Sequence, residues 1–361
     1  MKNSKKIIAL TGGGTAGHVA PNIALLPALR RLDFEIHYIG GKKGVERDLA
    51  LENKLPYHCV STGKLRRYLS FANITDIFRV ARGCVEALFI LSKLKPALIF
   101  SKGGFVAVPV AYAARLLGIP IIIHESDLSP GLANRIVAPF ASAICVSFEE
   151  TFEKLKSYYN SEKTSKIFFT GLPVREEILK GDAKKGRALC GFSEEKPFLL
   201  VMGGSLGATA INELVWEALP ELVKFYCVAH ICGQKNFKKI DVPGYKIFEY
   251  LGEELPHIIS AATLIVSRAG ASSIFEFLAL KKPNILIPLP LSQSRGDQIE
   301  NARVFCEKGF SRTLSQEEAT PIRLLSELNN LYANRENYIQ AMQNKTTDAI
   351  SNIIKIISDF I

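Results

Sequence analysis

Residues 5–18 read KKIIALTGGGTAGH and residues 197–208 read PFLLVMGGSLGA, and these two stretches decide the fold. In each stretch a short apolar run ends at a cluster of glycines, and a helical pattern follows. A second pair repeats the arrangement, with LIFSKGG at 98–104 and LIVSRAG at 264–270. Because both pairs occur in the same order in the two halves of the chain, the sequence indicates two similar domains.

Further apolar runs lack strict polar alternation and are separated by helical patterns, as in FEIHYIG (34–40), IPIIIHE (119–125) and AICVSF (143–148). Such runs are typical of parallel strands in a sheet that helices cover on both faces. The sequence therefore predicts the α/β class with two Rossmann-like domains. Ligands of such sheets bind at the carboxyl ends of the strands, so we expect the two sheets to face a deep interdomain cleft and to serve a two-substrate enzyme.

The polar stretch KSYYNSEKTSK at 156–166 separates the two halves. Polar segments of this kind are typical of domain boundaries. We therefore expect an amino-terminal domain over residues 1–165 and a carboxyl-terminal domain over residues 166–344. A helix at about 345–361 is expected to return to the first domain.

The chain has 361 residues, of which 48% are hydrophobic and 22% charged, a composition typical of globular proteins rather than disordered ones. Its net charge of +10 is uneven, because residues 1–165 hold 22 basic and 13 acidic side chains whereas residues 166–361 hold 23 and 22. The first half should favour an anionic partner, such as a phosphorylated ligand, nucleic acid or an acidic membrane surface. The absence of a recognised nucleic-acid motif in the sequence argues against nucleic acid.

The seven cysteines lack CxxC spacing, and six of them lie among apolar neighbours. This pattern predicts buried, reduced cysteines in a cytosolic protein and disfavours a disulfide or metal framework. The first residues lack the apolar core of a signal peptide, and the longest apolar candidate, 105–123, is interrupted by Pro109, Arg115 and Pro120. We expect a protein that is soluble or lies on a membrane surface.

Basic and apolar residues mix most densely over 64–82, in KLRRYLSFANITDIFRVAR. Arginine and lysine next to aromatic and aliphatic side chains are typical of a segment that lies on an anionic membrane. An amphipathic core helix with a solvated basic face would have the same pattern, so both interpretations stay open.

The glycines of GGGTAGH at 12–18 allow the backbone to approach a ligand, and the following helix start favours an anion. The spacing is not GxGxxG and the second strand ends in HYIGG without an acidic residue, which argues against a dinucleotide cofactor. His18 lies at the exit of this loop. It is either a structural, capping histidine or a general base, because an imidazole titrates near neutral pH.

Glu125 and Asp127, in HESDLSPGLANR at 124–135, directly follow an apolar run. They belong either to a solvated loop or to the mouth of a ligand site. Neither lies at metal-ligand spacing from a histidine, and the sequence contains no DxD motif, so a metal-dependent site is not indicated. We expect no metal and no cofactor.

In the second half, Ser205, Ser272 and Ser273 lie at glycine turns before helices. Hydroxyls and N–H groups at such positions either hold phosphate or cap the helix. Glu276 lies one turn into a helix, where its carboxylate could accept hydrogen bonds from ribose hydroxyls.

Polar groups of the second half also lie outside these glycine turns. Arg175, in GLPVR, lies at the domain junction. Asp297, Gln298 and Asn301, in RGDQIENA at 295–302, begin a helix and suit sugar hydroxyls better than phosphate.

Six motifs, GGTAGH, HESDLSPGLANR, GLPVR, GGSLGA, SRAGASSIFE and SRGDQIENA, carry a family resemblance through their order and spacing. From about residue 5 to residue 345 the chain resembles the MurG family of undecaprenyldiphospho-muramoylpentapeptide β-N-acetylglucosaminyltransferases. The resemblance implies the GT-B glycosyltransferase fold. It also implies an acceptor lipid bound by the amino-terminal domain and UDP-GlcNAc bound mostly by the carboxyl-terminal domain.

The reaction implied by this resemblance is inverting and belongs to peptidoglycan synthesis. The 4-hydroxyl of undecaprenyl-pyrophosphoryl-MurNAc-pentapeptide (lipid I) attacks the anomeric carbon of GlcNAc, UDP leaves, and lipid II forms. The implied location is peripheral, on the cytoplasmic face of the cell membrane, where a basic first domain would suit an anionic surface.

The resemblance also assigns roles to residues at matching motif positions. His18 would contact UDP-GlcNAc and would be the general base, with Glu125 as the other candidate for the base. Glu276 would bind the ribose, and Leu251 would lie beside the uracil. The remaining contacts with UDP-GlcNAc would come from Thr15, Gly17, Asp127, Asn134, Arg175, Ser205, Ala271, Ser272, Ser273, Asp297 and Gln298.

Two positions depart from the family's pattern. HESD replaces the frequent HEQN, so Asp127 stands for an asparagine, and Asp297 replaces the first glutamine of a frequent Gln-Gln pair. An amide donates and accepts hydrogen bonds, whereas an ionised carboxylate only accepts them. The sugar contacts at both positions are therefore expected to differ.

Three other functions are compatible with these motifs. A glycolipid transferase of the same fold would use another acceptor, such as diacylglycerol. A non-hydrolysing UDP-GlcNAc 2-epimerase would form UDP-ManNAc without any acceptor. A non-enzymatic nucleotide-sugar sensor would bind UDP-GlcNAc without turning it over.

Overall fold

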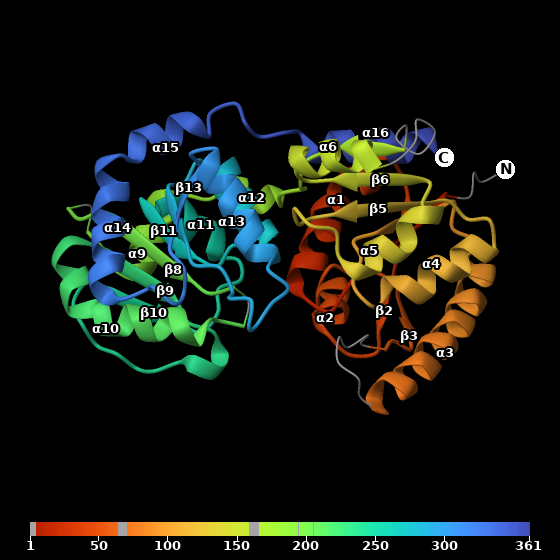
Figure 1. Cartoon of the computed structure of the whole chain (residues 1–361), viewed down its shortest axis with the longest axis horizontal. Coiled ribbons are helices and arrows are strands. Elements are labelled where there is room, and N and C mark those ends of the chain that lie inside the picture. Colours follow the sequence, from red (N-terminus) through yellow and green to blue (C-terminus); the bar gives the residue numbers. More distant parts are fainter. Residues whose placement is uncertain (1–4, 64–70, 159–165, 194, 205) are drawn as a thin grey trace. The chain divides into compact units, whose positions relative to one another are not determined.

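A computed structural model describes residues 5–63, 71–158, 166–193, 195–204 and 206–361. The chain divides into two compact units (Figure 1). Unit 1 comprises Met1–Pro173 and Thr347–Ile361, and unit 2 comprises Val174–Thr346.

Unit 1 is built on a parallel sheet with the strand order β3-β2-β1-β4-β5-β6-β7. The central strand β1 pairs with β2 at Ile8↔Ile36 and with β4 at Ile8↔Leu98. Most residues of its inner strands are buried on both faces, which explains why their sequences do not alternate. The strands are β1 (Ile7–Thr11), β2 (Glu35–Gly41), β3 (Tyr57–Val60), β4 (Leu98–Ser101), β5 (Ile121–Glu125), β6 (Ala143–Val146) and β7 (Ile167–Phe169).

Helices connect these parallel strands, as the alternation of patterns in the sequence predicts. The first begins with proline in its first turn, where the missing N–H costs nothing. The described helices of unit 1 are α1 (Ala20–Arg31), α2 (Val45–Glu52), α3 (Phe71–Leu94), α4 (Ala107–Leu116), α5 (Leu132–Val137), α6 (Glu149–Tyr158) and α16 (Ala349–Asp359), with 3₁₀ turns η1 (Ala16–His18) and η2 (Ala138–Phe140).

The division between the units falls later in the chain than the boundary predicted at 165/166. Strand β7 pairs with β6 at Val146↔Phe169 and so belongs to the sheet of unit 1. The unit ends at Pro173. The polar stretch at 156–166 therefore precedes the last strand of unit 1 in the sequence, and its polar composition did not mark the end of the domain.

Helix α16 belongs to unit 1, although it lies at the end of the sequence (Figure 1, dark blue). Its buried residues Ile353, Ile356 and Ile357 are part of the core that the inner strands form. At its end, Lys6 Nζ donates a hydrogen bond of 2.6 Å to the carbonyl of Ile361. This helix covers apolar surface of unit 1 that would otherwise face water.

Unit 2 repeats the arrangement with a parallel sheet in the order β10-β9-β8-β11-β12-β13. Strand β8 is central and pairs with β9 at Val201↔His230 and with β11 at Val201↔Val266. The strands are β8 (Phe198–Met202), β9 (Cys227–Ile231), β10 (Tyr245–Phe248), β11 (Leu264–Ser267), β12 (Asn284–Leu286) and β13 (Ser311–Thr313).

The helices of unit 2 follow recognisable start and stop signals. Helix α9 is capped by Asp182, whose carboxylate accepts hydrogen bonds from the N–H groups of Lys184 and Lys185, and it ends at Gly191 with a positive φ of 69°. The described helices are α8 (Glu176–Leu179), α9 (Ala183–Cys190), α10 (Thr209–Phe225), α11 (Leu255–Ala261), α12 (Ala271–Ala279), α13 (Asp297–Glu307), α14 (Pro321–Ala333) and α15 (Arg335–Ala341), with the 3₁₀ turn η3 (Gln234–Asn236).

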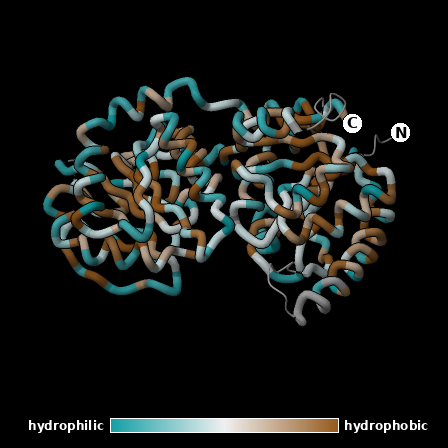
Figure 2. Tube along the Cα trace, in the orientation of Figure 1, coloured by the Kyte–Doolittle hydropathy of each residue, from teal (hydrophilic) through white to brown (hydrophobic). Residues whose placement is uncertain are grey.

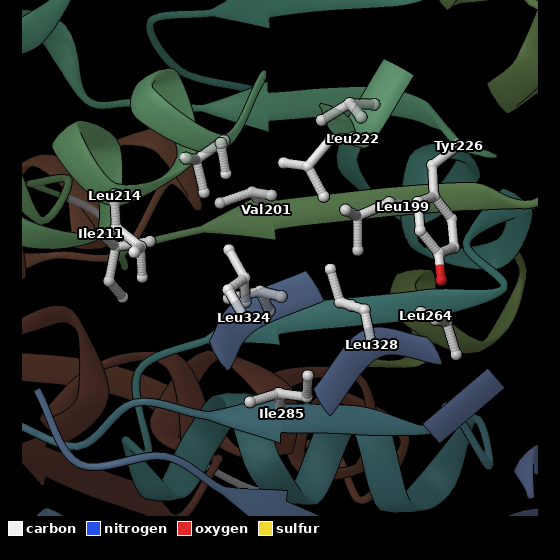
Figure 3. Packing of buried hydrophobic residues seen from close by; sticks show 14 of the residues in the cluster. Leu199, Val201, Ile211, Leu214, Leu222, Tyr226, Leu264, Ile285, Leu324 and Leu328 are labelled. Carbon is white, nitrogen blue, oxygen red and sulfur yellow. The ribbon is translucent and has the colours of Figure 1, made fainter. Parts of the chain in front are cut away.

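Each unit buries its own hydrophobic core between sheet and helices. Figure 2 shows hydrophobic residues concentrated along the strands of each unit. In one core of unit 2, side chains of strands β8, β11 and β12 pack against helices α10 and α14, with Leu199, Val201 and Leu264 close to Leu324 and Leu328 (Figure 3). This packing fixes the parallel strands in place, and the loops that follow them begin at their carboxyl ends.

The prediction that the cysteines are buried is wrong for two of them. Cys59 and Cys306 are exposed, whereas Cys190, which lies at a segment end in the sequence, is buried. Both exposed cysteines occupy positions whose side chains point away from the core despite apolar sequence neighbours. Among the helices of the described residues, none combines the length and the apolar character that crossing a membrane requires.

Candidate active site

The glycine loop after β1 is held from below by two side chains. Tyr38 Oη donates a 2.7 Å hydrogen bond to the carbonyl of Gly12, and the carboxylate of Glu46 accepts one of 3.2 Å from Gly14 N. Both side chains are buried. A Cβ atom on Gly13 would lie 2.6 Å from the Glu46 carboxyl carbon, so the loop fits closely over this carboxylate.

The loop after β4 approaches this glycine loop closely, and Asn134 of helix α5 in turn approaches the loop after β4. A Cβ atom on Gly104, which has a positive φ of 80°, would lie 2.3 Å from the carbonyl oxygen of Gly13. A Cβ atom on Gly103 would lie 2.8 Å from Asn134 Oδ1. The loops after β1, β4 and β5 therefore pack together at the carboxyl edge of the sheet, where parallel sheets bind ligands.

The residues predicted to face the donor lie at the exit of the first loop. His18 ends the 3₁₀ turn η1, and its N–H donates a 3.1 Å hydrogen bond to the carbonyl of Thr15. Thr15 is exposed, and Gly17 and His18 are half-buried. His18 as a residue is thus partly accessible, whereas its Nδ1 atom is buried. A general base must be within reach of the substrate proton that it receives.

Glu125, the other candidate base, is buried at the end of β5. One carboxylate oxygen accepts a 3.1 Å hydrogen bond from Asp127 N, and the other accepts bonds from Gly131 N at 2.8 Å and Asn134 Nδ2 at 2.9 Å. Asp127 itself is half-buried and Asn134 is buried. With both oxygens engaged in its own loop, Glu125 is better suited to shape the loop than to take a proton from a substrate.

A buried lysine beneath this loop escaped the sequence analysis. Lys102, 1% exposed, places Nζ 2.5 Å from His124 Nδ1 and donates a 2.7 Å hydrogen bond to Ser126 Oγ. His124 Nε2 lies 2.9 Å from the carbonyl of Gly171, so Nε2 carries the proton and Nδ1 accepts from the lysine. The only sequence signal was a charged residue at the end of an apolar strand.

Burial changes the titration of both groups. It lowers the pKa of Lys102 to about 7, although the nearby charges of Glu125 and Asp127 oppose this shift. Burial and the charge of Lys102 together hold the pKa of His124 well below its usual value. Unit 1 thus carries a buried ammonium group that titrates near neutral pH.

In unit 2, Arg175 and Glu276 form an ion pair that sequence patterns could not have indicated, because 101 positions separate them. Arg175 precedes α8, and its Nε and Nη2 donate to Glu276 Oε1 at 3.1 and 2.9 Å. Glu276 is buried in α12. Burial raises the pKa of its carboxyl above the ordinary value, and Arg175 opposes that shift.

The amino terminus of α12 lies after β11, with Ala271, Ser272 and Ser273 in its first turn. Ser272 and Ser273 are half-buried. The loop before them is fixed by Asn301, whose Nδ2 donates a 3.2 Å hydrogen bond to the carbonyl of Ala269. The N–H groups at such a helix start favour an anion.

The other predicted contacts hold their own loops. Gln298 Oε1 accepts a 3.1 Å hydrogen bond from Leu289 N, and Asp297 is ion-paired with Arg295 at 3.3 Å. Leu251 is buried after β10. Ser205 lies outside the described residues. Within the described ranges, groups of at least three His, Cys, Asp or Glu side chains suited to a metal ion are absent.

Comparisons with known proteins give this arrangement a family. Residues 8–146 match the glycosyltransferase family 28 N-terminal domain, and residues 198–357 match its C-terminal domain. A transferase of Clostridium kluyveri is 49% identical over 99% of each chain, and one of Clostridium tetani is 48% identical over 99% of this chain and 98% of that protein. Both are named UDP-N-acetylglucosamine–N-acetylmuramyl-(pentapeptide) pyrophosphoryl-undecaprenol N-acetylglucosamine transferase. The chain belongs to this family, MurG.

Solved structures agree with the MurG fold. Acinetobacter baumannii MurG has a TM-score of 0.75 at 24% identity, covering 99% of this chain and 100% of that one. A putative UDP-N-acetylglucosamine 2-epimerase from Listeria monocytogenes has a TM-score of 0.70 at 13% identity, covering 99% and 96%. At these identities the likeness concerns the fold alone. The predicted fold class, two Rossmann-like domains with parallel sheets as in GT-B glycosyltransferases, is confirmed.

Proposed function

We propose that this glycosyltransferase moves GlcNAc from UDP-GlcNAc to the 4-hydroxyl of undecaprenyl-pyrophosphoryl-MurNAc-pentapeptide, with inversion, to give lipid II. The observation that carries the proposal is the near-full-length identity of 49% with a transferase named for this donor group and acceptor lipid. Fold likeness extends to an epimerase as well, so the reaction class depends on the sequence relatives and on the site.

Unit 2 supplies the donor site in this proposal. The glycine loop after β8 and the start of α12 offer backbone N–H groups for the diphosphate, which needs no bound cation when a helix terminus stabilises the leaving group. Glu276 accepts hydrogen bonds from the ribose hydroxyls. Its pairing with Arg175 supports this role, because the guanidinium orients the buried carboxylate and opposes the rise in its pKa that burial causes.

Unit 1 supplies the base and the acceptor site. His18 takes the proton from the attacking 4-hydroxyl, and its partial exposure supports that role. Glu125 acts as a positioning residue that holds the loop carrying Asp127. The loops after β1 and β4 offer N–H groups to the acceptor's pyrophosphate.

An anionic membrane surface is the proposed partner of helix α3. Phe78, Val85 and Phe89 are 72%, 67% and 61% exposed and recur at helical spacing, so they form one apolar strip. Arg82 lies on the same strip, and Lys93 Nζ lies 4.1 Å from the centroid of the Phe89 ring. Exposed aromatic rings beside cationic groups suit the headgroup region of a membrane whose lipids are anionic. The exposed strip of α3 supports a peripheral location on the cytoplasmic face of the cell membrane.

The proposal is tested by measuring UDP release from UDP-GlcNAc in EDTA, with and without a synthetic lipid-linked muramoyl-pentapeptide. Release only with this acceptor is the expected result. Release with diacylglycerol instead would indicate another glycolipid transferase, and UDP-ManNAc formed without acceptor would indicate an epimerase. Binding of UDP-GlcNAc without turnover of any of these substrates would indicate a non-enzymatic sensor.

A further inference from the structure

A series of hydrogen-bonded side chains, all buried except the half-buried Trp216, runs through unit 2 towards its glycine loop. Trp216 Nε1 donates to Tyr245 Oη at 3.1 Å, and Tyr245 Oη lies 2.9 Å from His230 Nδ1. His230 Nε2 lies 2.9 Å from Asn212 Oδ1, and Asn212 Nδ2 donates to the carbonyl of Cys232 at 2.9 Å. None of these groups has a role in the transfer reaction described above.

In this series each side chain donates a hydrogen bond to the next, from Trp216 towards the Cys232 carbonyl. Asn212 must donate to the Cys232 carbonyl, so its oxygen faces His230 Nε2, which must then carry a proton. His230 Nδ1 accepts from the Tyr245 hydroxyl in turn. This arrangement requires a neutral imidazole, and burial lowers the pKa of His230 to about 3, so the ring stays neutral at physiological pH.

This series of hydrogen bonds ends at the Cys232 carbonyl, where two backbone turns pack closely against each other. A Cβ atom on Gly207, which has a positive φ of 76°, would lie 2.0 Å from the Cys232 carbonyl oxygen. A Cβ atom on Gly233 would lie 2.4 Å from the carbonyl oxygen of Leu206. Gly207 N also donates a 3.0 Å hydrogen bond to Gly204 O, which closes the glycine loop. The position of the Cys232 carbonyl therefore fixes the loop that packs on it.

We propose that Asn212 and His230 are positioning residues for the diphosphate of the nucleotide donor. Asn212, oriented by His230, holds the Cys232 carbonyl together with Asn236, whose Nδ2 donates to it at 3.3 Å. This carbonyl fixes Gly207, and the N–H groups of Gly204 and Leu206 beside it bind the phosphates. The proposal rests on the assignment of this loop to the donor in the proposed function. It predicts that removing these hydrogen bonds weakens binding of the phosphates and leaves binding of the nucleoside unchanged.

The experiment measures dissociation constants for UDP and for uridine by calorimetry, on the full chain and on Asn212→Leu. Leucine has a similar volume but makes neither hydrogen bond of the amide. The matched control is Tyr226→Phe, which removes the 3.2 Å hydrogen bond between Tyr226 and Asn329 in the same core. Figure 3 shows Tyr226 at the end of this core away from Ile211, the neighbour of Asn212.

We expect Asn212→Leu to raise the dissociation constant of UDP about tenfold and to change that of uridine less than about twofold. Tyr226→Phe should leave both constants unchanged. Unaltered UDP affinity in Asn212→Leu, or equal weakening of UDP and uridine, would overturn the proposal. Should Asn212→Leu fail to fold, Asn212→Ala, which also lacks both hydrogen bonds, gives the same comparison. Wild-type protein that binds neither ligand would instead contradict the proposed function.

Discussion

The glycine loops of the two units lie at equivalent positions in the fold, but groups of different charge support them. In unit 1 the loop after β1 lies over the carboxylate of Glu46, and the neighbouring loop covers the buried ammonium of Lys102. In unit 2 the loop after β8 rests on a backbone carbonyl held by the neutral side chains of Asn212 and His230. One strand–loop–helix arrangement thus tolerates charged or neutral support. Burial brings the pKa of Lys102 to about 7, whereas it lowers the pKa of His230 to about 3, so Lys102 is the group of these two that titrates near neutrality.

The largest expected difference between the units concerns catalysis. His18→Ala removes the proposed base in unit 1, and we expect kcat to fall about 100- to 10,000-fold with little change in the KM for UDP-GlcNAc. Glu276→Ala removes a proposed ribose contact in unit 2 and should mainly raise that KM. Steady-state kinetics with the lipid acceptor distinguish the two. Equal effects of both substitutions on both constants would refute the division of roles.

The next largest effects should be on the stability of the fold. Each unit has one glycine whose added Cβ would touch neighbouring backbone (crowded) and one whose added Cβ would meet nothing (open). Gly104→Ala and Gly207→Ala would each place Cβ against a carbonyl oxygen, and we expect a loss of about 3 kcal/mol or more in the free energy of unfolding. Gly14 and Gly204 also have positive φ, but a Cβ atom there meets nothing within 4 Å.

The matched substitutions Gly14→Ala and Gly204→Ala should therefore cost about 1–2 kcal/mol, the strain of the backbone conformation alone. Urea unfolding measures all four. Similar losses at crowded and open positions would show that the close approach of the loops contributes nothing.

The third prediction concerns pH and the buried ammonium of unit 1. The pKa of Lys102 is about 7 in the folded protein and 10.5 in the unfolded chain, so between these values the unfolded state binds the extra proton. The free energy of unfolding should therefore rise with pH over this window, by about 1.4 kcal/mol per pH unit from this group.

Lys102→Met should lose this rise, whereas Lys154→Met, at an exposed position of α6, should keep it. Unfolding at pH 7.5 and pH 9.5 provides the measurement. An unchanged pH dependence in Lys102→Met would mean that the lysine is not the titrating group.

The smallest expected effect compares the surfaces of the two units. The double substitution Phe78→Ser/Phe89→Ser should weaken binding to phosphatidylglycerol vesicles about tenfold, because two rings leave the apolar strip of α3. Phe225→Ser, which removes a ring that is 55% exposed in unit 2, should have no effect. Vesicle sedimentation tests both, and equal binding by all three proteins would contradict the assignment of α3 to the membrane.

The sequence predicted the local arrangement better than the contacts between distant segments. Strand runs and glycine turns gave both parallel sheets, because those signals lie within a few residues. The pairing of Arg175 with Glu276 and the contact of Lys102 with His124 depend on which strands become neighbours, and no local pattern encodes that.

Burial was also hard to predict where sequence neighbours mislead. Glu125 ends strand β5 and was expected either in a solvated loop or at the mouth of a ligand site. Its carboxylate is buried and accepts hydrogen bonds from Asp127 N and Gly131 N, a burial that the sequence did not indicate. Cys59 and Cys306 have apolar neighbours in the sequence but lie on the outer side of their elements. Which side of an element faces solvent is decided by packing with segments far along the chain.

The placement of α16 has a consequence for how the protein is made. The ribosome completes all of unit 2 before it releases the isoleucines of α16 that finish the core of unit 1. During translation, unit 1 must therefore wait with part of its apolar surface uncovered, while unit 2 already has every segment it needs. The nascent chain is thus expected to complete its second half before its first.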